Sequence, residues 1–317
     1  MRALLVVLAT LFLAHLAHAE PLRLGALGFG TVNWELDTIR REGLDTRHGF
    51  ELEVVPMGGG SASKIAFEGG AVDAIVSDWL WVARQRAAGR DYVFIPYSTA
   101  VGSIVVGPDS DITSLADLKG RRIGVAGGPL DKSWLILQAY AARELDFDLA
   151  GESEAVFGAP PLIYKTALNG GADAMVNYWH FLAKAKAKGF REVVSVADAA
   201  RALGLDPETP LLGYVLRERD LAKHPEWARL ALASREAKER LRDDAAWEPL
   251  RERMRPADEA EFEALREGFR AGIPPARPVD EAAAGRFLAL MRKLGGKKLV
   301  GDVSELPPGT FLSAPAL

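Results

Sequence analysis

The sequence predicts an α/β protein of two lobes, each built on a mixed, mostly parallel sheet that is flanked by helices. Short apolar runs rich in β-branched residues alternate with longer amphipathic runs, which is typical of β–α units around parallel strands. The chain has 317 residues, a length at which one hydrophobic core usually divides into two. An internal repeat of helix, turn and strand supports the same division, because each lobe would carry one copy.

Ten runs have the length and composition of β-strands. Helical patterns lie between most of them, and from His224 to Ala271 the chain turns to long charged runs that predict helices. Pro274, Pro275 and Pro278 interrupt this helical part. The expected strands span residues 22–27, 51–56, 74–76, 93–97, 103–106, 122–125, 154–157, 174–177, 193–196 and 212–216.

The first 19 residues have the pattern of a cleavable signal peptide. Arg2 provides a positive start, residues 3–16 are apolar, and Ala17-His18-Ala19 has the small side chains that precede a cleavage site. A permanent membrane anchor is the alternative, but a spanning helix usually needs about 20 apolar residues. We therefore expect export, with a mature chain that begins at Glu20.

The composition limits the cellular compartments and the classes of partner that fit this chain. The absence of cysteine excludes disulfides, thiolate chemistry and a lipidated N-terminal cysteine. An exported protein without a lipid anchor has to be held in by an outer membrane, which favours the periplasm of a Gram-negative cell. The 39 basic and 43 acidic residues give a net charge of −4, with no basic patch for nucleic acid or anionic lipid. We expect a monomer that binds neither.

The internal repeat aligns residues 64–79 with residues 165–179. The offset is 101 residues up to Ala71 and 100 after it, so that Val72 is one extra residue in the first copy. Each copy predicts a helix, a Gly-Gly cap, a turn with Ala and Asp, a short buried strand, and a Trp after the strand. The alternative is chance similarity between two ordinary helix–turn–strand units, which would leave the same local geometry.

This geometry matters because ligands of open α/β sheets bind outside the carboxyl ends of the strands. If each copy belongs to one lobe, the residues that follow the two repeat strands face the same cleft from opposite walls. These residues are Ser77, Asp78 and Trp79 in the first copy, and Asn177, Tyr178 and Trp179 in the second.

Several motifs together resemble the type II periplasmic binding proteins, in the branch of the sulfonate, taurine, nitrate and thiamine-precursor receptors. They are the opening strand at 22–25, the glycine and serine turn at 58–63, and the stretch 112–125, which includes Asp-Leu-Lys-Gly-Arg-Arg-Ile-Gly-Val. The resemblance implies a lobe of residues 20–101 and 209–317, a second lobe of residues 102–208, and a two-strand hinge. It also implies a solute receptor that serves the membrane subunits of an ABC importer.

Two helix starts are candidate sites for an anionic group, because a helix N-terminus offers unpaired backbone N–H groups and partial positive charge. One begins at Gly60 and Ser61, and the other lies at 128–133, where Asp131, Lys132 and Ser133 are the candidate contacts. The alternative is that these serines only cap their helices, as serine commonly does.

Four tryptophans fall at predicted strand-to-helix junctions: Trp34, Trp79, Trp134 and Trp179. A tryptophan at a cleft mouth gives a ligand a flat apolar wall and one N–H donor, which would suit a planar or partly apolar body. Packing in the core at the lobe edges is the alternative for each of them.

Polar candidates complete the predicted site. Thr31 and Asn33 follow the first strand and Tyr178 follows a later one, so all three could hydrogen-bond a ligand. Asp78 has two interpretations. It either accepts from a ligand amine or hydroxyl, or it orients Lys132, an arginine or a backbone turn.

The few reactive side chains in the sequence favour a binding protein over an enzyme. The mature chain has only His48, His180 and His224, and it lacks an H-x-x-x-H pair, a G-x-S-x-G elbow and a P-loop. We therefore expect no enzyme activity, no metal and no catalytic cofactor. His180, next to Trp179, keeps open the alternative of an enzyme related to those of pyrimidine synthesis, which share the fold implied by the resemblance.

The predicted ligand is a small organic anion with a planar or apolar body. Pyrroloquinoline quinone, an aromatic polycarboxylate, is one candidate as a transported ligand, and a sulfonate is the other, with taurine or a thiamine precursor as further alternatives. A receptor that signals to a membrane sensor would have the same sequence features as one that feeds an importer.

Overall fold

The computed structural model describes residues 20–312. The signal peptide predicted for residues 1–19 lies outside this range. Among the helices of the described range, none is both long enough and apolar enough to cross a membrane.

All ten predicted strands are present, and each begins and ends within two residues of its predicted bounds. Runs of β-branched and aromatic residues locate them well, because their side chains pack on a pleated surface. The strands are β1 (Leu22–Leu27), β2 (Leu52–Met57), β3 (Ala74–Asp78), β4 (Tyr92–Ser98), β5 (Ser103–Val106), β6 (Arg122–Ala126), β7 (Glu154–Gly158), β8 (Ala174–Asn177), β9 (Arg191–Ser195) and β10 (Leu212–Arg217).

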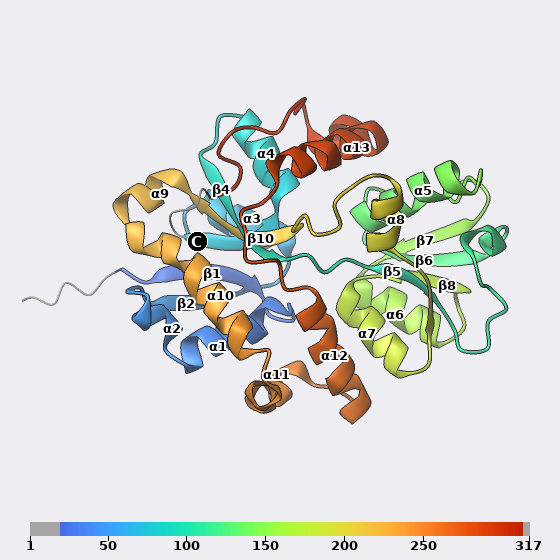
Figure 1. The fold of residues 1–317 in the computed structure, drawn as a ribbon, viewed down its shortest axis with the longest axis horizontal. Coiled ribbons are helices and arrows are strands. Elements are labelled where there is room, and N and C mark those ends of the chain that lie inside the picture. The colour runs from blue at the N-terminus through green and yellow to red at the C-terminus, as the bar shows by residue number, and fades with distance from the viewer. Residues whose placement is uncertain (1–19, 313–317) are drawn as a thin grey trace, which may run out of the picture.

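The strands form two five-stranded sheets of matching topology, one in each lobe (Figure 1). The first has the order β2-β1-β3-β10-β4 and the second the order β7-β6-β8-β5-β9. In each sheet one strand, β10 or β5, runs antiparallel to both of its neighbours. The chain passes between the sheets twice, from β4 to β5 and from α8 to β10. This confirms the predicted two-lobed fold with mixed, mostly parallel sheets.

Helices flank both sheets, and the C-terminal part is helical as predicted. It is divided more finely than expected, because Pro249 lacks the N–H of a regular helix and lies in a 3₁₀ segment. The α-helices are α1 (Val32–Arg41), α2 (Leu44–Arg47), α3 (Gly60–Glu68), α4 (Trp79–Ala87), α5 (Lys132–Glu144), α6 (Pro160–Leu168), α7 (Trp179–Ala187), α8 (Val196–Ala202), α9 (Glu218–Lys223), α10 (Leu230–Arg240), α11 (Arg251–Met254), α12 (Glu259–Ala271) and α13 (Glu281–Val300), and the 3₁₀ helices are η1 (Leu115–Leu118), η2 (Pro225–Arg229) and η3 (Asp244–Leu250).

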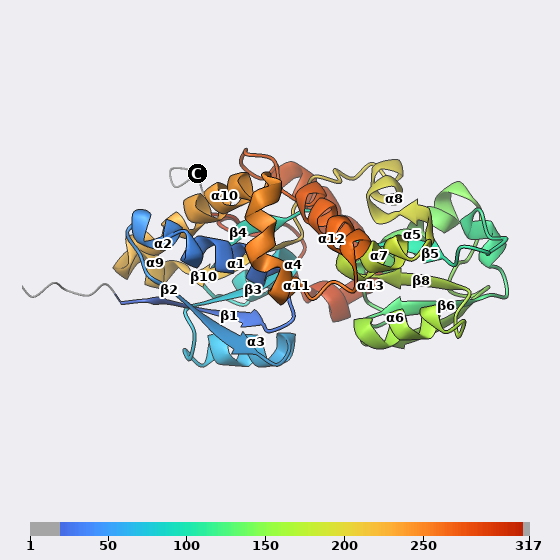
Figure 2. The same ribbon diagram turned by 90° about the horizontal axis from the view of Figure 1, so that it is seen from below.

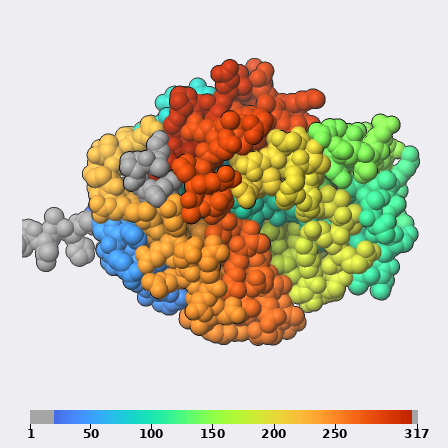
Figure 3. Space-filling model, viewed as in Figure 1, coloured from blue at the N-terminus to red at the C-terminus, as the bar shows by residue number. Residues whose placement is uncertain are grey.

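Two C-terminal helices connect the lobes. Helix α12 packs against α7 of the second lobe, and α13 packs against both α4 of the first lobe and α5 of the second. Figure 2 shows α12 between the two sheets, and Figure 3 shows α12 and α13 on the face of the molecule where the lobes meet. One continuous apolar cluster therefore runs from the first lobe through α13 into the second.

The two copies of the repeat superpose without a gap, so the predicted one-residue slip at Val72 was wrong. Helices α3 and α6 begin at residues 60 and 160, and strands β3 and β8 begin at residues 74 and 174. Gly70 and Gly170 both adopt positive φ, at 76° and 70°, in the turn after the helix. The offset is 100 throughout. Pairing Gly70 with Gly171 by residue type was wrong, because in the two Gly-Gly turns only Gly70 and Gly170 take the left-handed conformation.

An aspartate holds the same turn in both copies. The carboxylate of Asp73 accepts the backbone N–H of Arg23 at 3.0 Å, and the carboxylate of Asp173 accepts that of Arg122 at 2.8 Å. Each aspartate therefore fastens the turn before its strand to the strand beside it. The repeat is a structural unit of each lobe, as the sequence predicted.

The contact between α12 and α7 depends on the missing side chain of Gly268. A Cβ at this position would lie 2.8 Å from two ring carbons of Trp179. Replacing Gly268 by Ala should lower the midpoint temperature of unfolding by several degrees, because overpacking typically costs about 1–3 kcal/mol. Differential scanning calorimetry measures this midpoint.

Gly285→Ala in α13 is the matched control. A Cβ at Gly285 meets no atom within 4 Å, so this variant should keep or raise the midpoint, since Ala favours a helix over Gly. Equal midpoints for the two variants would contradict the packing of Trp179 on Gly268.

Candidate functional site

The carboxyl ends of the parallel strands in both sheets point towards the region between the lobes (Figure 2). In the first lobe these ends lead into loop 28–31, loop 58–59 and Asp78. In the second lobe they lead into loop 127–131, Ala159 and Tyr178. Because ligands of α/β sheets bind beyond the carboxyl ends of the strands, the interlobe region is the candidate binding site.

An ion pair joins the two lobes at this place. The Lys132 Nζ lies 3.6 Å from the Asp78 Oδ2, and both side chains are about three-quarters buried. Asp78 is the last residue of β3 in the first lobe, whereas Lys132 is the first residue of α5 in the second. The structure thus brings together two residues that the sequence predicted for opposite walls.

Three further side chains interact electrostatically with this pair. Lys64 of α3 acts on both Asp78 and Lys132, while Asp131 and Tyr178 act on Lys132. We call the five residues the interlobe charge cluster. It draws Lys64 and Asp78 from the first lobe and Asp131, Lys132 and Tyr178 from the second.

Local sequence explains how both carboxylates reach the strand ends. Asp78 is the N-cap of α4, and its Oδ1 accepts the backbone N–H of Trp81 at 3.0 Å. Asp131 is the N-cap of α5, and its Oδ1 accepts the backbone N–H of Trp134 at 3.2 Å. Aspartate is among the preferred N-cap residues, so a strand followed by Asp and a helix fixes a carboxylate at the junction.

The interlobe ion pair is charged at neutral pH. The carboxylate of Asp78 raises the pKa of Lys132 above the ordinary lysine value, against the effect of burial. Burial disfavours the charged form of Asp78, but Lys132, Lys64 and the Trp81 N–H together lower its pKa. Each group therefore stabilises the charge of the other across the two lobes.

Burial disfavours the charged forms of the other three residues of the interlobe charge cluster. Burial lowers the pKa of Lys64, whose Nζ lies 4.9 Å from the ring centroid of Trp81. Burial also raises the pKa of Asp131 and that of Tyr178. Tyr178 remains 44% exposed, so its phenol ring is open to a ligand.

Three of the predicted tryptophans are core residues, which corrects the expectation that they form a ligand wall. Trp34, Trp79 and Trp134 are each at most 5% exposed. The ring of Trp79 packs against Phe287 and Phe311, with centroids 5.8 and 5.7 Å away. These partners come from the C-terminal part of the chain, far from Trp79 in sequence. Packing against them leaves the indole fully buried.

Trp179 differs from its counterpart Trp79. It is only half-buried, and its ring meets that of Trp34 edge-on across the lobes, with centroids 6.0 Å apart and an angle of 87°. Trp34 in turn contacts Trp247 and Phe269. Trp179 is therefore the one predicted tryptophan that keeps part of its ring accessible.

The buried polar candidates stabilise the loops rather than offering free groups. The amide of Asn33 donates to the carbonyl oxygens of Leu27 and Gly30, at 2.7 and 2.8 Å. The amide nitrogen of Asn177 donates to Pro160 O at 3.0 Å, while its oxygen accepts the N–H of Tyr178.

Ser77 is also buried, and Thr31 hydrogen-bonds with Tyr97. Ligand contact by these four residues stays a prediction, and the hydrogen bonds of Asn33, Asn177 and Thr31 show that these three side chains also hold the loops at the strand ends. The sequence located the strand-to-helix junctions, but it did not show which polar side-chain atoms would hydrogen-bond to the backbone.

The two predicted helix starts are accessible to different degrees. Gly60 and Ser61 are exposed at the start of α3, whose N-cap is Gly59 rather than a serine. Added Cβ atoms at Gly59 and Gly60 would meet nothing within 4 Å, so the space above this helix start is open. Ser133, the second residue of α5, is half-buried.

Sequence reasoning missed several apolar side chains near the strand ends. Phe29 is 68% exposed in the loop after β1, Phe157 is 37% exposed in β7, and Leu162 is 59% exposed at the start of α6. Lys64 was also missed as a site residue. A phenylalanine between two glycines directly after a strand, as at Phe29, is the signal that could have pointed to an exposed ring.

His180 is unsuited to acid–base chemistry at neutral pH. Its ring lies 4.4 Å from that of Phe181 and 5.7 Å from that of Trp179. Burial lowers the pKa of His180 to about 4, and the charge of Lys184 contributes to this. The imidazole is therefore neutral near pH 7.

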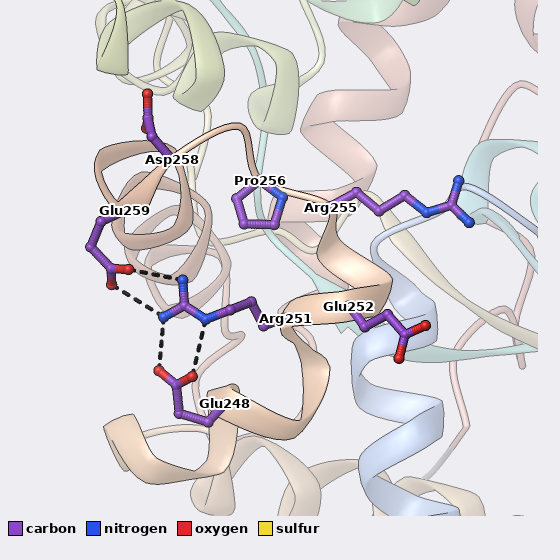
Figure 4. A pocket seen from close by; sticks show the side chains of 7 residues that line it. All are labelled: Glu248, Arg251, Glu252, Arg255, Pro256, Asp258 and Glu259. Atoms are coloured by element: carbon purple, nitrogen blue, oxygen red, sulfur yellow. Dashed lines mark hydrogen bonds and ion pairs between the residues drawn. The ribbon is translucent and has the colours of Figure 1, made fainter.

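A hollow of about 590 Å³ lies on the first lobe between η3, α11 and the start of α12 (Figure 4). Three of its charged side chains are paired with one another, since Arg251 donates to the carboxylates of Glu248 and Glu259. It does not lie at strand ends. Within residues 20–312, no group of three His, Asp or Glu side chains is placed to hold a metal ion.

Two mixed sheets with converging strand ends are the two-lobed fold of the periplasmic binding proteins, and solved structures of that kind match it. One is the alkanesulfonate-binding protein SsuA of Xanthomonas axonopodis pv. citri bound to MOPS, with a TM-score of 0.68 and 18% identity over 93% of this chain and 99% of that one. Another is the periplasmic aliphatic sulphonate binding protein SsuA of Escherichia coli, with a TM-score of 0.65 and 19% identity over 89% and 88%. An ABC transporter from Parabacteroides distasonis matches with a TM-score of 0.69 and 15% identity over 93% and 99%.

Residues 40–233 match the model of the NMT1/THI5-like family, and the chain belongs to this family. No curated protein sequence matches the chain. The family and the fold agree with the resemblance seen in the sequence.

The low pKa of His180 predicts a specific pH dependence of stability. As the pH falls below 6.5, the unfolded chain binds a proton at this imidazole before the folded protein does. The free energy of unfolding should therefore fall between pH 6.5 and about pH 4 through this group, and level off below that. NMR of the imidazole protons should give a midpoint near pH 4.

His180→Gln provides the control for this prediction. Urea unfolding of the variant should show a smaller loss of stability between pH 7 and pH 4.5 than the wild type shows. A His180 midpoint near 6.5, or an unchanged pH dependence in the variant, would contradict the burial of a neutral imidazole.

Proposed function

We propose that this protein is the solute-binding component of an ABC-type importer, and that it takes a small organic anion between its lobes. The observation that carries the proposal is the interlobe charge cluster, where Lys132 and Lys64 lie in helices that follow the carboxyl ends of strands in the two lobes. A solute bound there would touch both lobes at once. Such contacts favour the closed arrangement, which an importer can recognise.

The cationic groups support an anionic ligand. Lys132 is the first residue of α5, so its ammonium group lies beside the positive end of that helix dipole. The start of α3, beneath the open space at Gly59 and Gly60, offers further backbone N–H groups. Lysine ammonium groups and free helix N–H groups together favour an acidic head group.

Exposed rings support an apolar body on the ligand. Phe29, Phe157 and Tyr178 all lie at or beside strand ends and keep 37–68% of their surface exposed. Binding sites for small solutes usually combine such apolar walls with a few polar contacts. The sequence predicted an apolar or planar body from tryptophans, whereas the exposure of Phe29, Phe157 and Tyr178 is what supports it here.

We favour a sulfonate over pyrroloquinoline quinone as the ligand. The cluster holds two lysines and two aspartates, which leaves too little positive charge for an aromatic polycarboxylate. The names of two similar structures, an alkanesulfonate-binding and an aliphatic sulphonate binding protein, support the same choice. The protein would use no catalytic cofactor.

We further propose a monomer in the periplasm that docks on the membrane subunits of the importer. The N-terminal sequence pattern and the similar periplasmic binding protein of Escherichia coli named above support this location. We keep the lobes as residues 20–101 with 209–317, and residues 102–208. The two passages of chain between the sheets support these bounds.

Isothermal titration calorimetry tests the proposed ligand class. We expect binding of ethanesulfonate, butanesulfonate or benzenesulfonate, and no binding of pyrroloquinoline quinone. Lys132→Met should weaken sulfonate binding at least about tenfold, because it removes a charged hydrogen-bond donor from the site. Mass spectrometry should recover the solute unchanged after release.

Lys188→Met is the matched control, since Lys188 is an exposed lysine at the far end of α7. It should bind as the wild type does. Absence of heat with every sulfonate, or equal affinities of Lys132→Met and the wild type, would contradict the proposed site. Conversion of the solute would favour an enzyme instead.

A further inference from the structure

The lysine best placed to bind an anion already has an anionic partner within the protein. Lys132 Nζ lies 3.6 Å from the Oδ2 of Asp78. A solute anion that approaches Lys132 therefore meets a carboxylate at the same place.

The carboxylate of Asp78 is fixed on one side only. Its Oδ1 accepts the backbone N–H of Trp81 at the start of α4, which leaves Oδ2 to face the second lobe. Because Asp78 belongs to the first lobe and Lys132 to the second, the pair forms only when the lobes stand close together. Opening of the lobes would separate the two charges.

Three other titratable side chains surround the Asp78–Lys132 pair. Lys64 adds positive charge near Asp78, while Asp131 is bound to the N–H groups of its own helix and faces Lys132 from the same lobe. The phenol of Tyr178 faces Lys132 and Asp131. Of these five groups, Asp78 is the carboxylate that reaches Lys132 from the opposite lobe.

We propose that Asp78 is a specificity-determining residue that acts as an internal competitor for Lys132, and this inference rests on the function proposed above. Its carboxylate pairs with Lys132 and holds the lobes together. A solute anion takes this place on Lys132, so that only an anion able to replace the carboxylate is retained. The ion pair thus sets a minimum strength of interaction with Lys132 that a solute anion must reach in order to bind.

Asp78→Asn separates the charge of Asp78 from its structural role. The amide oxygen can still accept the N–H of Trp81, so α4 keeps its N-cap. Asp280→Asn is the matched control, because Asp280 caps α13 in the same way by accepting the N–H of Ala283 at 3.0 Å. Asp280 is exposed and is not part of the interlobe charge cluster.

The first measurement needs no ligand. The chain contains no cysteine, so Glu68→Cys and Asn169→Cys, at exposed positions of the two lobes, provide unique sites for nitroxide labels. Double electron–electron resonance should show longer distances in Asp78→Asn and in Lys132→Met than in the wild type or Asp280→Asn. The double variant should match the single ones, since either change alone breaks the pair. Unchanged distances would overturn the proposal.

The second measurement titrates ethanesulfonate by calorimetry. Asp78→Asn should bind it about tenfold more tightly than the wild type, because the competing charge is gone, while Asp280→Asn should bind as the wild type does. Weaker binding by Asp78→Asn would show that Asp78 positions Lys132, and would overturn the proposal. If no sulfonate binds the wild type, the proposed function fails, and the label distances alone decide whether the ion pair joins the lobes.

Discussion

The ion pair between Asp78 and Lys132 is the contact that connects the two lobes at the strand ends. Each partner stands where it does because a parallel strand ends and a helix begins, and an aspartate caps the helix at that junction. The same junction thus provides the local stability of the helix and the chemistry of the site. Placing two such junctions opposite each other requires both sheets to present their carboxyl ends to the same region.

The C-terminal helices maintain this arrangement from the other side. Helix α12 packs on α7, and α13 packs on α4 and α5, so both helices contact elements of the second lobe. The Trp34–Trp179 contact and the ion pair of Lys184 with Glu261 lie in the same layer between the lobes. The lobes are thus joined by apolar packing on one side and by the charge cluster at the strand ends.

The repeat shows how one unit produced two different walls. At an offset of 100 residues, Asp78 corresponds to Tyr178, and Trp79 corresponds to Trp179. The first copy contributes a carboxylate and buries its indole under α13. The second contributes a phenol and leaves its indole half-buried. A shared backbone therefore carries a carboxylate at one strand end and a phenol at the other.

The sequence predicted the fold better than the site. Strands such as β1 and β8 could be located to the residue, because strand composition is a local property. The fate of Trp79 could not be predicted, because the rings that cover it, Phe287 and Phe311, come from more than 200 residues later in the chain. The hydrogen bonds of Asn33 could not be predicted for a different reason. The side-chain amide of Asn33 donates to the carbonyl oxygen of Leu27, and a polar residue type alone does not show this.

A crystal structure of the protein with bound butanesulfonate tests the central claim most directly. We expect the sulfonate group on Lys132 between the lobes, with Asp78 displaced from the lysine and the alkyl chain near the exposed aromatic side chains. A solute bound elsewhere, such as at the hollow around Arg251, with the Asp78–Lys132 pair intact, would contradict it.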